Sequence, residues 1–130
     1  MNTHELIHAD FVQALHCRNV IRVPFADITH FKAEQKYVVA YHVGGQLLLD
    51  TPLIELERVY GERLVRTHRS ALVARDRLIH FQNERPSIRE SAYVLLRGLA
   101  EPIAVSRLRI AVVRAAVAQI FNHHQAGEAA

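Results

Sequence analysis

The chain has 130 residues, of which 50% are hydrophobic and 22% are charged, and this is ordinary for one globular domain that buries its core without disulfides or structural metals. A single cysteine, Cys17, excludes an internal disulfide, and no apolar run is long enough to span a bilayer. Polar residues interrupt any signal-peptide core near the start, so the composition favours a cytoplasmic protein without a membrane partner.

The basic residues are unusual in kind more than in number. The formal net charge is +3, but fourteen of the 16 basic residues are Arg and the other two are Lys32 and Lys36. Planar guanidinium groups suit bidentate contacts to phosphate or guanine, although a GC-rich genome also enriches arginine. The basic set is therefore compatible with a nucleic-acid partner and does not establish one.

Residues 1–10 are polar and weakly periodic, and we expect a linker stub, a disordered N-terminus or a frayed helical turn. They contain His4-Glu5-Leu6-Ile7-His8, which matches the HExxH pattern of zinc peptidases. A zinc hydrolase needs this motif on a long helix and a third ligand beyond it, and the sequence indicates neither. We therefore expect no enzyme, no metal site and no cofactor.

The middle of the chain is rich in strand patterns. Hairpin turns are predicted at Cys17-Arg18 and Gly44-Gly45, and a short helix is predicted to begin with Thr51 as cap and Pro52 at its first position and to end at Gly61. Strands are predicted over residues 11–16, 19–23, 28–31, 37–43, 46–50, 64–65, 71–73, 78–81, 92–96 and 102–105.

The last predicted element is a helix from Arg107 to about Asn122 with Ser106 as its cap. Residues 123–130, which include His123 and His124, are expected to form a flexible tail. With two helices and eight or more strands, the domain is expected to be mainly β. The expected apolar stripe of the last helix consists of Leu108, Val112, Ala116 and Ile120, widened by Val113, Val117 and Phe121.

Three polar patches interrupt these elements. The first is Glu34-Gln35-Lys36-Tyr37, the second is Arg66-Thr67-His68-Arg69-Ser70, and the third is Ser106-Arg107-Leu108-Arg109. The second patch has little apolar surface for a core, so it faces water or an anion. In the third, two cations stand at a helix N-terminus, where the dipole disfavours them. They indicate a bound anion, unless they extend to acidic neighbours such as Glu101.

The order and spacing of these patches resemble the LytTR (LytR/AlgR-type) DNA-binding domain, most of all its AlgR branch. The resemblance covers residues 11–122 and implies an elongated, mainly β fold of about ten short strands, with a short middle helix and a C-terminal helix. It implies that loops, not a recognition helix, read double-stranded DNA. The residues that carry it are 24–34 with Tyr37-Val38, 53–56, 64–73 and 102–107.

The resemblance also implies roles for individual residues. Arg69, where other members have Asn, would read guanine. Tyr37 or Val38 stands where members have a His in the first loop, and His68 either contacts DNA or bonds a neighbouring backbone group. The implied base-contacting set is Arg69, Arg107, Tyr37 and Val38, and the implied backbone or supporting set is Gln35, Lys36, His68, Ser70, Ser106, Arg109 and Arg66.

The family is the output module of bacterial two-component response regulators, which implies a transcriptional regulator. An N-terminal receiver domain would belong to the full-length protein, and pairs of chains would occupy repeated half-sites on DNA. The residues alone leave another class open, in which the same arginine clusters bind an anionic small ligand or an acidic protein.

Overall fold

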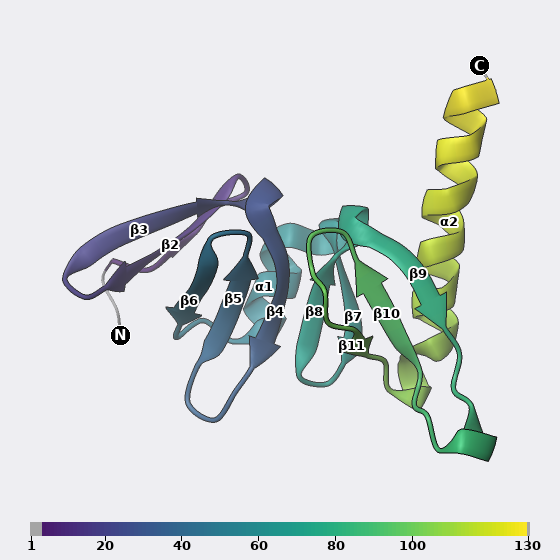
Figure 1. The fold of residues 1–130 in the computed structure, drawn as a ribbon. Helices are drawn as coiled ribbons and strands as arrows, with labels where there is room; N and C mark the ends of the chain where they lie inside the picture. Colours follow the sequence, from purple (N-terminus) through teal and green to yellow (C-terminus); the bar gives the residue numbers. More distant parts are fainter. Residues whose placement is uncertain (1–3, 130) are drawn as a thin grey trace.

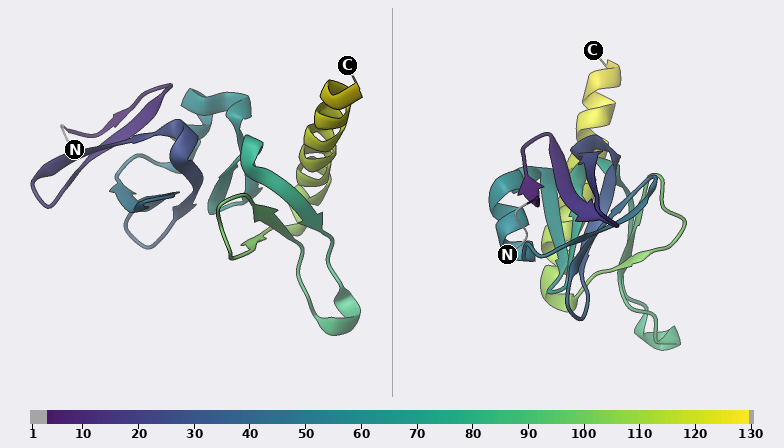
Figure 2. Two further views of the ribbon diagram at one scale, coloured as in Figure 1. Left: turned by 45° about the horizontal axis from the view of Figure 1, so that its top comes forward. Right: turned by 90° about the vertical axis from the view of Figure 1, so that its left-hand side faces the viewer.

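The computed structural model describes residues 4–129, with side chains through Phe121, and arranges them as three antiparallel sheets in a row (Figure 1). The left view of Figure 2 shows the same elongated row, and the right view looks along it from the end with the first sheet. The mainly β class and the elongated fold are confirmed. The first sheet has the order β1-β2-β3, the central sheet β6-β5-β4-β8-β7 and the third sheet β11-β10-β9.

The strands are short and follow one another through tight turns. In chain order they are β1 Leu6–Ile7, β2 Phe11–His16, β3 Asn19–Pro24, β4 Ile28–Ala33, β5 Val38–His42, β6 Gly45–Leu49, β7 Leu64–His68, β8 Ala71–Ala74, β9 Leu78–Gln82, β10 Tyr93–Leu96 and β11 Ile103–Ala104. The helices are α1 Leu53–Tyr60 and α2 Ile110–Ala129. Short 3₁₀ turns lie at η1 Phe25–Asp27, η2 Gly61–Arg63, η3 Arg75–Arg77, η4 Pro86–Ile88 and η5 Arg107–Arg109.

The predicted hairpin turns differ in how closely they match the structure. Cys17 and Arg18 connect β2 to β3 with φ angles of 49° and 68°, as a two-residue type I′ loop requires. The turn after β5 consists of Val43 and Gly44, one residue earlier than predicted. Gly45 has φ 142° and already pairs with His42. The hairpin is confirmed, and its register is shifted by one residue.

Two apolar clusters hold the sheets together, and the β7–β8 hairpin contributes to both. Leu64 and Leu72 belong to the cluster formed with the first sheet, β4–β6 and α1. Val65 and Val73 belong to the cluster formed with the third sheet and α2. Since side chains alternate between the faces of a strand, this hairpin is buried on both sides. It therefore lies between the two halves of the domain.

The N-terminal residues differ from the expected linker or helical turn. Leu6 and Ile7 form the edge strand β1 and pair with Gln13 and Val12 of β2. The carboxylate of Glu5 accepts hydrogen bonds from the backbone N–H groups of Asp50 (2.8 Å) and Thr51 (2.7 Å) and from the Thr51 hydroxyl. Residues 4–7 therefore pack into the fold, and Glu5 satisfies the backbone in front of α1.

The predicted cap of α1 is wrong, because the Thr51 hydroxyl bonds to Glu5. The N-cap residue of α1 is Pro52, and no side chain of that position caps the helix. Thr51 directs its hydroxyl to Glu5 and does not act as the cap. Gly61 ends the helix with φ 54°, as predicted, because this left-handed conformation favours glycine.

The C-terminal helix confirms the predicted apolar stripe in part. Val113, Ala116, Val117 and Ile120 pack in the second apolar cluster as predicted, and the other three predicted residues are exposed. Residues 107–109 form a 3₁₀ turn, so the α-helical phase begins at Ile110. Leu108 is 94% exposed, and Val112 and Phe121 are also exposed. The helix extends to Ala129, beyond the predicted end at Asn122, and the side chains of His123 and His124 lie outside the described residues. The stripe that packs on the third sheet is Ile110, Val113, Ala116, Val117 and Ile120.

The role of Glu5 can be tested by removing its carboxylate. Glu5→Ala is expected to lower the free energy of unfolding by about 1.5 to 3 kcal/mol, because two backbone N–H groups lose a charged acceptor. Urea denaturation measures this change. Glu62→Ala removes an exposed carboxylate that makes no hydrogen bond with the described residues, and it is expected to change stability by less than about 0.5 kcal/mol. Equal stability of the two variants would contradict the role of Glu5.

His30 gives the fold a dependence on pH. Its ring is 4% exposed, stacks on Tyr41 with centroids 4.4 Å apart, and shares a 2.9 Å hydrogen bond between Nδ1 and the Thr29 hydroxyl. Burial, with a smaller contribution from Lys32, lowers the pKa of His30 from 6.5 to about 4. The unfolded chain therefore binds a proton at a pH where the folded chain does not.

We expect stability to be full above pH 6.5 and to fall as the pH drops towards 4, by up to about 3 kcal/mol from this group. Urea denaturation at both ends of this range measures the loss. His30→Gln is expected to flatten the dependence, whereas His16→Gln, at an exposed position of β2, is expected to keep it. The same pH dependence in all three proteins would refute the assignment.

Candidate nucleic-acid interface

The three polar patches lie along one edge of the molecule, at the lower side of Figure 1, where β4 turns into β5, β7 turns into β8, and β11 leads into α2. Two backbone hydrogen bonds connect them. The N–H of Ala33 donates to the Ser70 carbonyl (2.8 Å), and the N–H of Ser106 donates to the Thr67 carbonyl (2.9 Å). We call this edge, formed by residues 34–37, 68–70 and 106–109, the contact edge.

The ring of His68 is fixed by the β7–β8 turn. Its Nδ1 accepts the backbone N–H of Ser70 (3.2 Å) and lies 2.9 Å from the Ser70 hydroxyl. A backbone N–H can only donate, so the neutral ring carries its proton on Nε2. His68 therefore bonds a neighbouring backbone group, which was one of the two expected roles, and still has an Nε2–H to donate elsewhere.

Arg66 supports the turn from within. One terminal nitrogen donates to the Arg69 carbonyl (2.7 Å), and the other pairs with the carboxylate of Glu57 on α1. Only 16% of its side chain is exposed. Thr67 is fully buried, so the second patch does not face water as a unit. Within this patch, the Arg69 side chain is exposed to solvent and makes no hydrogen bond or ion pair with another side chain among the described residues.

The first loop is a tight hairpin connection, and one of its candidate base-contacting residues is buried. Glu34 and Tyr37 exchange backbone hydrogen bonds of 2.8 and 3.2 Å, and the loop exposes Gln35, Lys36 and, by 45%, Tyr37. Val38 is 7% exposed and belongs to the first apolar cluster. The expectation that the Val38 side chain contacts bases is therefore wrong, because β5 directs it into the core.

The third patch presents its arginines from η5. The Arg107 side chain is 85% exposed, and its Nε donates to Oε2 of Glu84 at 3.2 Å. Arg109 is also exposed. Ser106 does not cap the helix with its side chain, contrary to expectation. Its backbone N–H is used for the bond to Thr67, which fixes the position of η5 relative to β7.

A pocket of about 460 Å³ joins the second and third patches. Its lining includes His68, Ser106 and Arg107 together with Glu84 and Arg89 of the β9–β10 loop. Sequence reasoning assigned no role to that loop, although its charged residues were visible. The alternative to a bound anion was that the arginines of the third patch extend to acidic neighbours such as Glu101, and in the structure Arg107 contacts Glu84.

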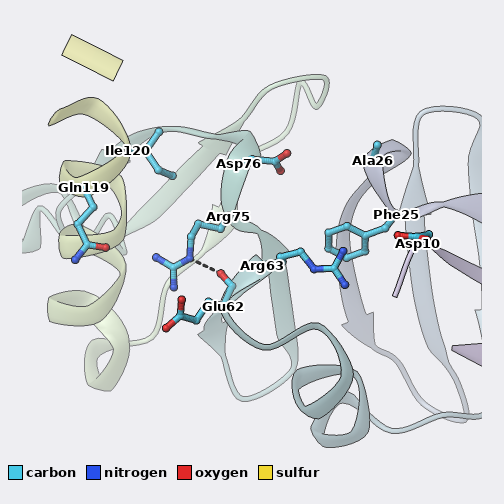
Figure 3. Close-up of a pocket in the computed structure, with 9 residues that line it drawn as sticks. All are labelled: Asp10, Phe25, Ala26, Glu62, Arg63, Arg75, Asp76, Gln119 and Ile120. Carbon is cyan, nitrogen blue, oxygen red and sulfur yellow. Dashed lines mark hydrogen bonds between the residues drawn. The ribbon is translucent and has the colours of Figure 1, made fainter. Parts of the chain in front are cut away.

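Another pocket lies away from the contact edge, between the two halves of the domain (Figure 3). Its volume is about 990 Å³, and its lining combines Arg63 and Arg75 with Asp10, Glu62 and Asp76. Arg75 donates to the Glu62 carbonyl, and the Arg63 guanidinium lies over the Phe25 ring. The mixture of both charges gives this pocket no preference for an anion.

The HExxH residues do not form a metal site. They lie on and around the strand β1 and not on a helix, and Glu5 is bonded to the backbone before α1. The His8 ring stacks on Phe11, and its Nδ1 accepts the Asp10 N–H. Among residues 4–121, whose side chains the structure describes, no three His, Cys, Asp or Glu side chains converge as metal ligands. In the part of the chain that the structure describes, no helix has the length and apolarity needed to cross a membrane.

Comparison with known proteins identifies the family of the domain. The sequence model of the LytTr DNA-binding domain matches residues 18–118. The chain belongs to the LytTR DNA-binding domain family. This LytTR domain is therefore a DNA-binding domain, and the resemblance read from the order of the polar patches is confirmed.

One relative is the positive alginate biosynthesis regulatory protein of Pseudomonas aeruginosa, which is 41% identical over 99 residues. The match covers 75% of this chain and 39% of that protein, so the chain spans about two fifths of the relative's length. Among solved structures, a LytTr DNA-binding domain from a Bacillus cereus protein described as a methyl-accepting/DNA response regulator superposes with a TM-score of 0.71. That match has 18% identity and covers 83% of this chain and 96% of the other.

The supporting role of Arg66 is testable through stability. Arg66→Ala is expected to lower the free energy of unfolding by about 1 to 3 kcal/mol, because Glu57 and the Arg69 carbonyl lose their donor. Arg66→Lys is expected to recover only part of this loss, since an ammonium cannot reproduce the two-pronged contact. Urea denaturation of both variants provides the measurement.

The matched control is Arg69→Ala, which removes an exposed guanidinium from the same turn. Its expected change in stability is below about 0.5 kcal/mol. A loss of stability as large as that of Arg66→Ala would show that Arg69 also supports the turn, which contradicts the difference proposed between the two arginines.

Proposed function

We propose that this domain binds duplex DNA sequence-specifically as the output module of a bacterial transcriptional regulator in the cytoplasm. The observation that supports it best is the alignment of three polar loops on one edge by backbone hydrogen bonds. Lys36, Arg69 and Arg109 make no side-chain hydrogen bond with the described residues, so their charge is available to phosphates or base edges.

Each residue of the edge has a proposed role. Arg107 and Arg69 read guanine through its O6 and N7 atoms, and Tyr37 contacts the bases next to the first loop. The proposed backbone contacts come from Gln35, Lys36, His68, Ser70, Ser106 and Arg109. His68 suits such a contact because its Nε2–H can donate to a phosphate oxygen. Arg66 acts indirectly by supporting the turn.

We propose two further partners. The chain spans about two fifths of the alginate regulator, and the Bacillus cereus domain comes from a protein described as a response regulator. We therefore include an N-terminal receiver domain in the full-length protein, which makes it part of a two-component system. We also include two copies of the domain on repeated half-sites, which the stoichiometry of the DNA complex would test.

The experiment that tests the function is selection of bound sequences from a random duplex library. Recovery of a consensus supports sequence-specific binding. The rival class, an anionic-ligand or acidic-protein module, predicts no consensus and no salt-sensitive binding to random duplex DNA. Phosphate contacts instead predict affinity that falls steeply as salt rises.

Two substitutions separate the proposed base contacts from the phosphate contacts. Arg107→Ala is expected to weaken binding to the consensus duplex by about 1 to 3 kcal/mol and to relax preference at one base pair. Lys36→Ala is expected to weaken binding to all sequences alike and to reduce the salt slope by about 1. Gel-shift titrations at several salt concentrations measure both. Unchanged specificity in Arg107→Ala would remove it as a base reader.

A further inference from the structure

An acidic side chain is bound to the arginine that is proposed to read DNA. The Glu84 carboxylate accepts the Arg107 Nε–H at 3.2 Å, and the exposed fractions of the two side chains are 32% and 85%. An exposed ion pair of this kind contributes little to stability. Its position at the contact edge calls for a different explanation, because a carboxylate repels the phosphates of an approaching duplex.

Glu84 lies on a loop that hydrogen bonds close just beyond it. The β9–β10 loop projects from the body of the domain in all the ribbon views (Figures 1 and 2), with η4 at its tip. Arg85 and Glu90 exchange backbone hydrogen bonds of 2.8 and 3.0 Å across it, and their side chains pair at 3.3 Å. The Glu84 N–H donates to the Asn83 side chain at 2.8 Å. The backbone that carries Glu84 is thus held by hydrogen bonds on both sides, and the Arg107 side chain is directed towards its carboxylate.

The contact leaves the useful part of Arg107 available. Only Nε is bound to Glu84, so both terminal NH₂ groups can still donate. These two groups are the parallel donors that an end-on guanidinium presents to the O6 and N7 atoms of guanine. An arginine whose rotamer is already restrained also loses less conformational freedom when it binds.

We propose that Glu84 is a positioning residue that restrains Arg107 for guanine recognition, so that it increases discrimination between bases while it lowers overall affinity for DNA. The inference rests on the proposed function. Discrimination increases because a restrained Arg107 presents its two donors in the geometry that fits guanine and adjusts less readily to another base. The loss of affinity arises from a negative charge placed near the phosphates.

The test uses the variants Glu84→Ala and Glu84→Gln and two DNA probes. The first probe is the consensus duplex from the library selection. The second is the same duplex with one base pair replaced, at the position where Arg107→Ala loses its preference. Glu84→Ala is expected to reduce the ratio of the two affinities about two- to fivefold, the range of exposed ion pairs. Glu84→Gln keeps an acceptor oxygen for Nε and is expected to lose less. Both variants are expected to bind random-sequence duplex more tightly, most clearly at low salt.

Two controls separate positioning from a general effect of charge or folding. Glu55→Ala removes the partner of Arg58 in a similar exposed ion pair on α1, and it is expected to leave the affinity ratio unchanged. In an Arg107→Ala background, Glu84→Ala is expected to have no effect on the ratio, because the residue that it positions is gone. Thermal unfolding midpoints confirm that all variants are folded.

The outcomes distinguish the two levels of the proposal. An unchanged ratio in Glu84→Ala, or the same reduction in the Arg107→Ala background, overturns the role of Glu84 while sequence-specific binding stands. Failure to recover any consensus refutes the proposed function. An Arg107→Ala variant with full specificity removes Arg107 as a base reader while sequence-specific binding stands. The inference about Glu84 falls in either case.

Discussion

The burial of the β7–β8 hairpin on both faces is the constraint on which the rest of the domain depends. Leu64 and Leu72 face one apolar cluster, and Val65 and Val73 face the other. Because both faces of these strands are buried, polar residues are concentrated where the hairpin turns, at residues 68–70. The same packing therefore joins the halves of the domain and places a basic turn at the middle of the contact edge.

Much of the fold was predictable because it depends on local patterns. The Cys17-Arg18 hairpin, the glycine end of α1 and the strand runs follow from turn chemistry and β-branched composition. The start of α2 was not, because residues 107–109 form a 3₁₀ turn, so Leu108 is exposed and Ile110 joins the buried stripe. The sequence alone does not show where the 3₁₀ turn gives way to the α-helix.

The candidate site shows the same division. Its polar patches were visible in the sequence, and their order alone indicated the family. The acidic partners were not visible: Glu5 meets Thr51, Glu57 meets Arg66 and Glu84 meets Arg107 across separations that carry no periodic signal. Val38 is not available to bases because strand alternation directs its side chain into the core. The sequence alone does not fix which residues of a strand point inward, since this depends on the register.

The bonds that join the three loops, from Ala33 to Ser70 and from Ser106 to Thr67, involve backbone atoms alone. Side chains such as Arg69 and Arg107 can therefore be exchanged without loosening the frame that presents them. A lineage can then drift through new recognition sequences by single substitutions while its scaffold stays intact. In such a scaffold, the DNA sequence preference can change while the fold that presents the contacting side chains is retained.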